Sequence, residues 1–401
     1  MNFGFSPDDE QNPFLAFSQM FSGQQSNNDV WKTAADIAKQ IATQESSGTN
    51  VDPIARSQIL ELVRVAELNL SQIVGINAPA KLDIKVVSPA EWATQSLETF
   101  RPFFERFGEA IEVSQDPTDS DPFSSMLGQM FSTLGPVMVA TSAGSMLGHL
   151  AVHTLGQYDL PVPRPENTIL LVPENMNTVA ATADAPETEV YLATLLQNAI
   201  THAVFSVDHV RKRAEGLFID YAAAFQPSTD FLDADFENPD SMQQIQELAE
   251  RFNSPDAVLS MMQSPAHELL VPQVTALIAP ILGFVDYQLD QVAAPMITSF
   301  DAIKAAITSR RSTSSDSDHF MQKLLGVNMS NETIALGRKF IDGIVERAGD
   351  EGLERLWNDE LDLPTASEVS APGLWLERIG FDNDDAAMFE VPDDISGLED
   401  L

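Results

Sequence analysis

A segment without proline runs from Glu189 to Phe225, and it limits how this chain can fold. Its only glycine is Gly216. Apolar or weakly polar residues recur in it with the period of one helix face. These positions are Tyr191, Leu195, Leu196, Ala199, His202, Ala203 and Val210. The pattern predicts one long helix with a buried face, against which the rest of the chain packs.

One part of this segment can be compared with a zinc-binding helix. In His-Glu-x-x-His, two histidines four residues apart bind one zinc ion from one helix face, and the glutamate acts as general base. This chain has His202 at the second histidine, but Asn198 at the first and Ala199 at the base. A single histidine on an apolar helix is more often a hydrogen-bonded core residue than a ligand. Other residues must therefore decide whether a metal binds.

Composition excludes several classes of function. Cysteine is absent, so the chain has no disulfides, thiolate metal clusters or cysteine nucleophile. It carries 60 acidic against 22 basic residues, a formal charge of −38, which repels nucleic acid and anionic lipid. Such a surface favours solubility and basic partners, or reflects a host whose proteins are acidic in general.

The N-terminal residues show no basic region followed by an apolar stretch, so we expect no signal peptide and a cytoplasmic location. The segment Pro122 to Tyr158 contains no Asp, Glu, Lys or Arg and is long enough to cross a membrane. It is rich in Ser, Thr, Gly and Gln and lacks flanking basic residues. We therefore expect buried core helices and no membrane span.

The remaining patterns predict a mainly α (α+β) fold with many helices and a small β element before the motif helix. We expect a flexible N-terminal arm over residues 1–28, one helical domain over 29–380, and an acidic C-terminal tail over 381–401. Short strands are predicted at 81–87 and 168–172, and 175–188 is predicted to be a loop. Predicted helices include 29–45, 51–74, one starting with a capping box at Ser88 to Glu91, 265–294 and 331–348.

Several sequence landmarks occur together in a recognisable order. They are Gly-Gln-Tyr-Asp at 156–159, the strand 168–172 with Pro-Glu-Asn after it, Thr-His-Ala-Val-Phe at 201–205, Arg310-Arg311, Leu-Leu-Gly at 324–326, Gly-Arg-Lys-Phe at 337–340 and Leu-Pro-Thr at 363–365. On these residues the chain resembles an actinobacterial zincin-like hydrolase family, often labelled zinc-dependent metalloprotease. Some relatives are linked by name to coenzyme F420 biosynthesis. The resemblance covers roughly residues 29 to 380.

The resemblance implies where a metal site would lie. The family's His-Glu-x-x-His falls on Asn198, Ala199 and His202, and a later glutamate, a plausible further ligand, falls on Leu282. Only His202 is left as a metal ligand, and no catalytic base remains. A replacement donor could come from other residues in the same half of the chain, namely Asp208, His209, Asp286 and Asp290.

Two functions remain open at this point. The first is a catalytically degenerate zincin-like protein that binds a protein or peptide partner and uses no cofactor. The alternative is an active zinc-dependent metallopeptidase or hydrolase with a non-standard ligand set. A third reading, a helical protein of another class, predicts no strand before the motif helix. His149 and His153 are also four apart, but no acidic residue lies between them, so we expect core or interface histidines there.

Overall fold

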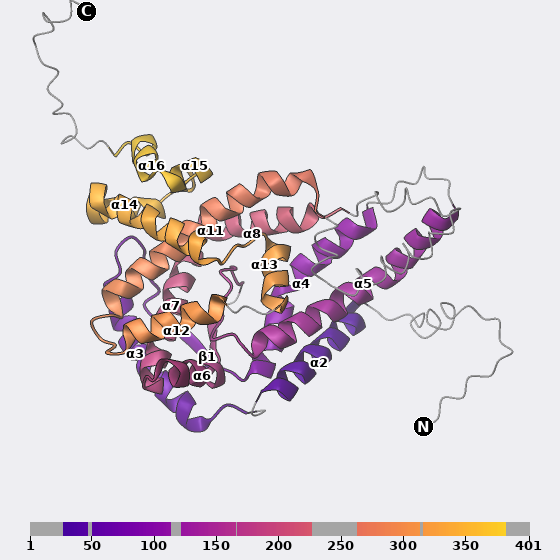
Figure 1. Ribbon diagram of the computed structural model, residues 1–401, viewed down its shortest axis with the longest axis horizontal. Coiled ribbons are helices and arrows are strands. Elements are labelled where there is room, and N and C mark those ends of the chain that lie inside the picture. Colours follow the sequence, from indigo (N-terminus) through magenta and orange to yellow (C-terminus); the bar gives the residue numbers. More distant parts are fainter. Residues whose placement is uncertain are drawn as a thin grey trace, which may run out of the picture.

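A computed structural model describes residues 27–46, 50–113, 122–165, 167–226, 263–312 and 316–381. The described chain is mainly helical with one small parallel sheet (Figure 1), which confirms the predicted fold class. In chain order the elements are α2 (Asn27–Glu45), α3 (Pro53–Leu70), β1 (Asp83–Val86), α4 (Pro89–Val113), α5 (Pro122–Ala151), β2 (Thr168–Leu171), α6 (Pro173–Ala183), α7 (Glu187–Phe205), α8 (Asp208–Ala223), α11 (Pro265–Val292), α12 (Phe300–Ser312), α13 (Asp316–Leu325), α14 (Asn331–Leu356), the 3-10 helix η2 (Glu360–Asp362), α15 (Ala366–Ser370) and α16 (Pro372–Arg378).

Helices α2, α4 and α5 pack side by side and form one layer of the molecule, on the right of Figure 1. The predicted capping box starts α4: Ser88 N donates to Glu91 Oε2 at 3.0 Å, and Glu91 N donates to Ser88 Oγ at 3.2 Å. Gly144 on α5 lets α2 approach closely, since a Cβ there would lie 2.3 Å from the carbonyl oxygen of Ala34. Small residues thus set the spacing within this layer.

The sheet holds the loop that contains Tyr158 in place. β1 pairs with β2 in parallel, with Asp83 opposite Thr168 and Val86 opposite Leu171. On its other side β2 binds the segment after α5: Gln157 N donates to Leu170 O, and Val172 N donates to Leu155 O. Both predicted strands are confirmed, and backbone hydrogen bonds hold the loop around residues 155–158 along β2.

The predicted long helix is wrong as a single element, because the chain breaks at Ser206 and Val207. α7 and α8 meet there at 90°. Ser206 Oγ donates to His202 O at 2.7 Å, which satisfies a carbonyl of the last turn of α7. Val207 is extended (φ −73°, ψ 114°), and Asp208 begins α8 with an acidic first turn, which suits a helix N-terminus.

The expected loop at 175–188 is also wrong, because α6 occupies most of it. Pro173 takes the first turn, where its missing N–H costs nothing, and Glu174 complements the helix dipole. The helix ends at Asp184, which adopts a left-handed conformation with φ 50°. α6 then packs on α7.

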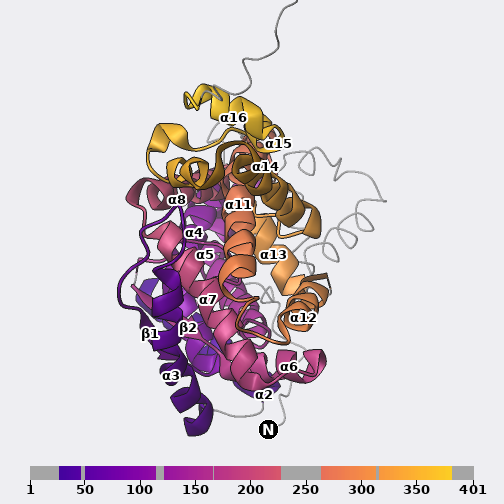
Figure 2. The ribbon, with the colours of Figure 1, turned by 90° about the vertical axis from the view of Figure 1, so that its left-hand side faces the viewer.

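α11 and α14 cross at backbone contact (Figure 2), and this crossing places the charged residues described below. A Cβ on Gly337 would lie 1.7 Å from the carbonyl oxygen of Ala279, and one on Gly283 would lie 2.1 Å from Gly337 C. Only glycine at both positions permits this distance. α14 kinks at Gly349, where φ is 59°.

One helix of the described chain, α11, is long and apolar enough to cross a membrane, and the bent pair α7–α8 passes the same test together. In α11, 56% of the apolar window is buried inside the protein, as in a core helix of a folded domain. The predicted arm and tail lie almost wholly outside the described residues. Their roles stay predictions.

Candidate functional site

The positions of the degenerate motif lie on the buried face of α7. Asn198 and Ala199 have no exposed surface, and His202 is 6% exposed. Both ends of the Asn198 amide are bonded to backbone: Oδ1 accepts from Tyr158 N at 2.8 Å, and Nδ2 donates to Thr194 O at 2.9 Å. Asn198 therefore fixes the loop after α5 to the motif helix.

Gly156 makes room for this amide. A Cβ added at Gly156 would lie 2.6 Å from the Asn198 side chain, well inside normal contact distance. The loop is held from other directions as well: Asp159 Oδ2 accepts from Leu155 N at 2.7 Å and from Arg310 Nη2 at 3.0 Å. Tyr158 is thus placed by contacts on both sides of it.

Both ring nitrogens of His202 have partners within the protein. Nδ1 lies 2.9 Å from Tyr158 Oη, and Nε2 lies 3.0 Å from Asn167 Oδ1. Because an amide oxygen only accepts, Nε2 carries the proton, and Nδ1 accepts from the tyrosine hydroxyl. Burial lowers the pKa of His202 below its ordinary value, so the neutral ring is favoured.

These residues do not fit a zinc ion. A catalytic zinc needs about three protein donors and an open position. The donor atoms that His202 and Asn198 could offer a metal are Nδ1 and Oδ1. Each already accepts a hydrogen bond from Tyr158, from its hydroxyl and its backbone N–H respectively. Ala199 carries no base, and Leu282, at the further ligand position, is an apolar residue in the wall of a nearby cleft.

Three of the four expected replacement donors, the aspartates, form ion pairs elsewhere. Asp208 pairs with Arg211 and Lys212 at the start of α8. Asp286 and Asp290 pair with Lys304 and Arg338. Within the described ranges no group of three or more His, Asp or Glu side chains is arranged to hold a metal ion. His209 and the other candidates are therefore not brought to His202 as a ligand set.

A cleft of about 320 Å³ lies beside the motif helix. α7 contributes Ala193, Gln197 and Thr201 to it, and the loop contributes Tyr158, whose hydroxyl is hydrogen-bonded to His202. The opposite walls come from α11, α12 and α14 and are mostly aliphatic or aromatic: Leu282, Val285, Leu289, Phe300, Ile303, Ile307, Ile334 and Ala335. A concave, largely apolar site of this size with a few polar groups is typical of ligand pockets.

A ring of charges lies at this cleft and supplies part of its lining. Lys304 on α12 and Arg338 on α14 both bridge the same two carboxylates of α11, Asp286 and Asp290. Burial alone would lower the pKa of Lys304, but its hydrogen bonds to the two aspartates outweigh this and raise it. The same balance raises the pKa of Arg338, so both cations stay charged.

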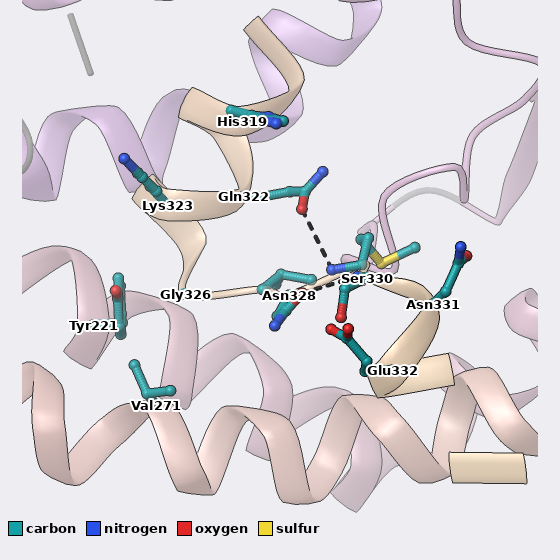
Figure 3. Close-up of a pocket in the computed structure, with 12 residues that line it drawn as sticks. Tyr221, Val271, His319, Gln322, Lys323, Gly326, Asn328, Ser330, Asn331 and Glu332 are labelled. Carbon is teal, nitrogen blue, oxygen red and sulfur yellow. Dashed lines mark hydrogen bonds between the residues drawn. The ribbon is translucent and has the colours of Figure 1, made fainter. Parts of the chain in front are cut away.

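A second, larger hollow lies between α8, α11, α13 and the start of α14 (Figure 3). The hydrogen bonds that hold its loop include those from Met329 N to Gln322 Oε1 at 3.3 Å and from Ser330 N to Asn328 Oδ1 at 2.9 Å. None of the predicted site positions at 198, 199, 202 and 282 lines it. The cleft beside α7 is therefore the candidate site.

The remaining histidines with assigned surroundings form no metal site. Of the pair that sequence spacing singled out, His153 is exposed, and His149 Nδ1 lies 3.0 Å from Glu45 Oε1 on α2, with both of these side chains partly exposed. His267 caps α11, because its Nδ1 accepts from Ser264 N at 3.0 Å, and its ring packs on Tyr221 and Phe225. Neither contact resembles a metal site.

Comparisons with known proteins identify the family and the fold of this chain. The sequence profile of the zincin-like metallopeptidase family matches residues 30–376, and the chain belongs to that family. A crystal structure from Chloroflexus aurantiacus, described as a "putative hydrolase with a novel fold", is similar with a TM-score of 0.56 and 19% identity. The similarity covers 87% of this chain and 98% of that one, and it shows a shared fold. No curated protein matches the chain.

The resemblance read from the sequence is thus confirmed for the family. The actinobacterial origin and the link to coenzyme F420 stay predictions. Sequence reasoning missed the roles of Tyr158 and Asn167, although Gly-Gln-Tyr-Asp was noticed as a landmark. The available signal was the occurrence of this landmark together with an asparagine at the first motif position, the two segments that hydrogen-bond in the structure.

Proposed function

We propose that this chain is a non-catalytic member of the zincin-like metallopeptidase family, which binds a protein or peptide partner without hydrolysing it. One observation carries the proposal: the polar atoms at the motif positions are all used within the protein. Tyr158 joins them, since its backbone N–H binds Asn198 and its hydroxyl binds His202. The motif residues therefore hold the loop after α5 against α7 by hydrogen bonds.

The proposal assigns the cleft beside α7 as the binding site, because the motif helix and Leu282, at the further ligand position, both line it. No nucleic acid is expected there, since the chain carries a formal charge of −38. We place the protein in the cytoplasm, as the sequence analysis expected, and propose no membrane span and no cofactor.

Metal analysis of the purified, full-length chain tests this proposal. The protein is expressed with zinc in the medium, purified without chelator, and measured by mass spectrometry for bound metals. We expect far less than one zinc per chain, and no peptide hydrolysis with or without added zinc. About one zinc per chain, together with hydrolysis that a chelator abolishes, would instead establish the alternative, an active peptidase with a non-standard ligand set.

A further inference from the structure

The charged ring at the cleft has hydrogen-bond donors that are not used within the ring. An ammonium group has three N–H donors and a guanidinium five. Lys304 Nζ uses two, toward Asp286 Oδ1 and Asp290 Oδ1, each at 2.8 Å. Arg338 uses Nη1 for the same aspartates and Nε for Asp342 Oδ1 at 2.8 Å. Among the described residues, the third N–H of Lys304 and the Nη2 group of Arg338 have no hydrogen-bond acceptor.

The groups that face the cleft are more positive than the ring as a whole. Asp286, Lys304 and Arg338 line it, whereas Asp290 and Asp342 do not. The charged part of the lining therefore consists of two cations and one carboxylate. Both cations are only partly exposed, at 37% and 26% of their side-chain surface, so an anion that reached them would be partly desolvated.

The rest of the cleft offers no charge. Leu282, Leu289, Ile303 and Ile307 line it together with Phe300, and Gln197 and Thr201 supply neutral polar groups from α7. A matching ligand therefore has one negatively charged end and an apolar body. An apolar amine is disfavoured, because the two cations of the lining outnumber its one carboxylate, Asp286, which both cations already bind.

We propose that this cleft binds a carboxylate carried by a short apolar group. The carboxylate accepts hydrogen bonds from Lys304 Nζ and Arg338 Nη2, and the apolar part lies between α11 and α12. This inference rests on the proposed function, because it names the ligand chemistry of the same site. Surface carboxylates more than about 8 Å away are screened at physiological salt. Of the three carboxylates that bind the two cations directly, only Asp286 lines the cleft.

Two sources could supply this chemistry: a free medium-chain carboxylic acid, or the C-terminal residue of a peptide. Calorimetric titration of the full-length chain with octanoate, 1-octanol and octylamine tests the charge. Titration with Ala-Ala-Leu, with a free or an amidated C-terminus, tests the peptide source. We expect octanoate or the free peptide to bind roughly tenfold or more tightly than its uncharged counterpart, as a hydrogen bond to a charged group implies.

Matched variants locate the site. Arg338→Gln removes a donor that lines the cleft, and we expect the favoured carboxylate to bind about ten- to a hundredfold more weakly. Lys339→Gln makes the same charge change at the next, exposed residue, and should leave binding within about twofold. Ala335→Phe fills the cleft without altering any charge and should weaken every ligand that binds.

The titrations distinguish a carboxylate site from its absence. Tighter binding of octanoate alone, or of the free peptide alone, supports the proposal and identifies the source. No binding of either carboxylate, equal binding of neutral ligands or octylamine, or normal binding by folded Ala335→Phe overturns it. A chain found to hold zinc and cleave peptides would refute the proposed function, and would leave the result of these titrations standing.

Discussion

Restoring the family motif is expected to damage this protein and not to give it zinc. The perturbation is the double variant Asn198→His with Ala199→Glu, which writes His-Glu-x-x-His into α7. If the chain were a zinc site that lacks only these side chains, the variant should bind metal. In the structure the residues around positions 198 and 199 pack closely against the present side chains, so the larger new side chains do not fit.

The size of the effect follows from three contacts. Losing Asn198 Oδ1 leaves the buried Tyr158 N–H without its acceptor, which costs about 1–3 kcal/mol. An imidazole is larger than the amide, and Gly156 already contacts that amide so closely that it admits no further carbon; overpacking costs about 1–3 kcal/mol. A carboxyl group at Ala199, which has no exposed surface, loses its hydration for about 1–3 kcal/mol more, even when protonated.

Together these terms amount to roughly 3–9 kcal/mol, comparable with the whole stability of a typical domain. We expect a much lower melting temperature or insoluble protein, measured by calorimetry and circular dichroism. Asn358→His with Ala181→Glu makes the same two substitutions at exposed positions, and serves as the control. A motif variant that melts near the wild-type temperature and holds one zinc per chain would refute this reasoning.

Three further predictions concern single contacts. Tyr158→Phe leaves Nδ1 of the buried His202 without its donor, so chemical denaturation should show a loss of about 1–3 kcal/mol; an unchanged midpoint would show that this hydroxyl contributes nothing. Because burial lowers the pKa of His202 from 6.5, the unfolded chain binds more protons, and stability should fall as pH drops below about 6.5. His202→Gln should lose this part of the pH dependence, whereas the exposed control His153→Gln should keep it; equal slopes in all three proteins would contradict the assignment. Gly337→Ala places a methyl group 1.7 Å from Ala279 O, must separate α11 from α14, and should cost more than about 1–3 kcal/mol, seen as a lower melting temperature.

Local signals in the sequence predicted many elements correctly. The helix predicted at 51–74 has such a local signal: Asp52 caps α3 by accepting from Ile54 N at 3.0 Å, and Pro53 follows in the first turn. The capping box at Ser88 and the buried strand at Thr168 are equally local. Such features depend on residues two to four positions apart, which a sequence displays directly.

The errors came where tertiary packing decides. Residues around Ser206 are compatible with a continuous helix, and the 90° bend appears only because both α7 and α8 bury apolar faces against different neighbours. The partners of His202 were out of reach as well: Tyr158 is 44 residues away in the chain and Asn167 is 35. The sequence showed that ligands were missing, whereas only the structure shows what replaced them.

The state of the His202 ring tests the central claim most directly. A long-range proton–nitrogen NMR spectrum of nitrogen-15 histidine-labelled protein, assigned by the signal lost in His202→Gln, reports which nitrogen carries the proton. We predict a neutral ring with the proton on Nε2, and no change when equimolar zinc is added. A zinc-dependent shift of either ring nitrogen of His202 would contradict the account.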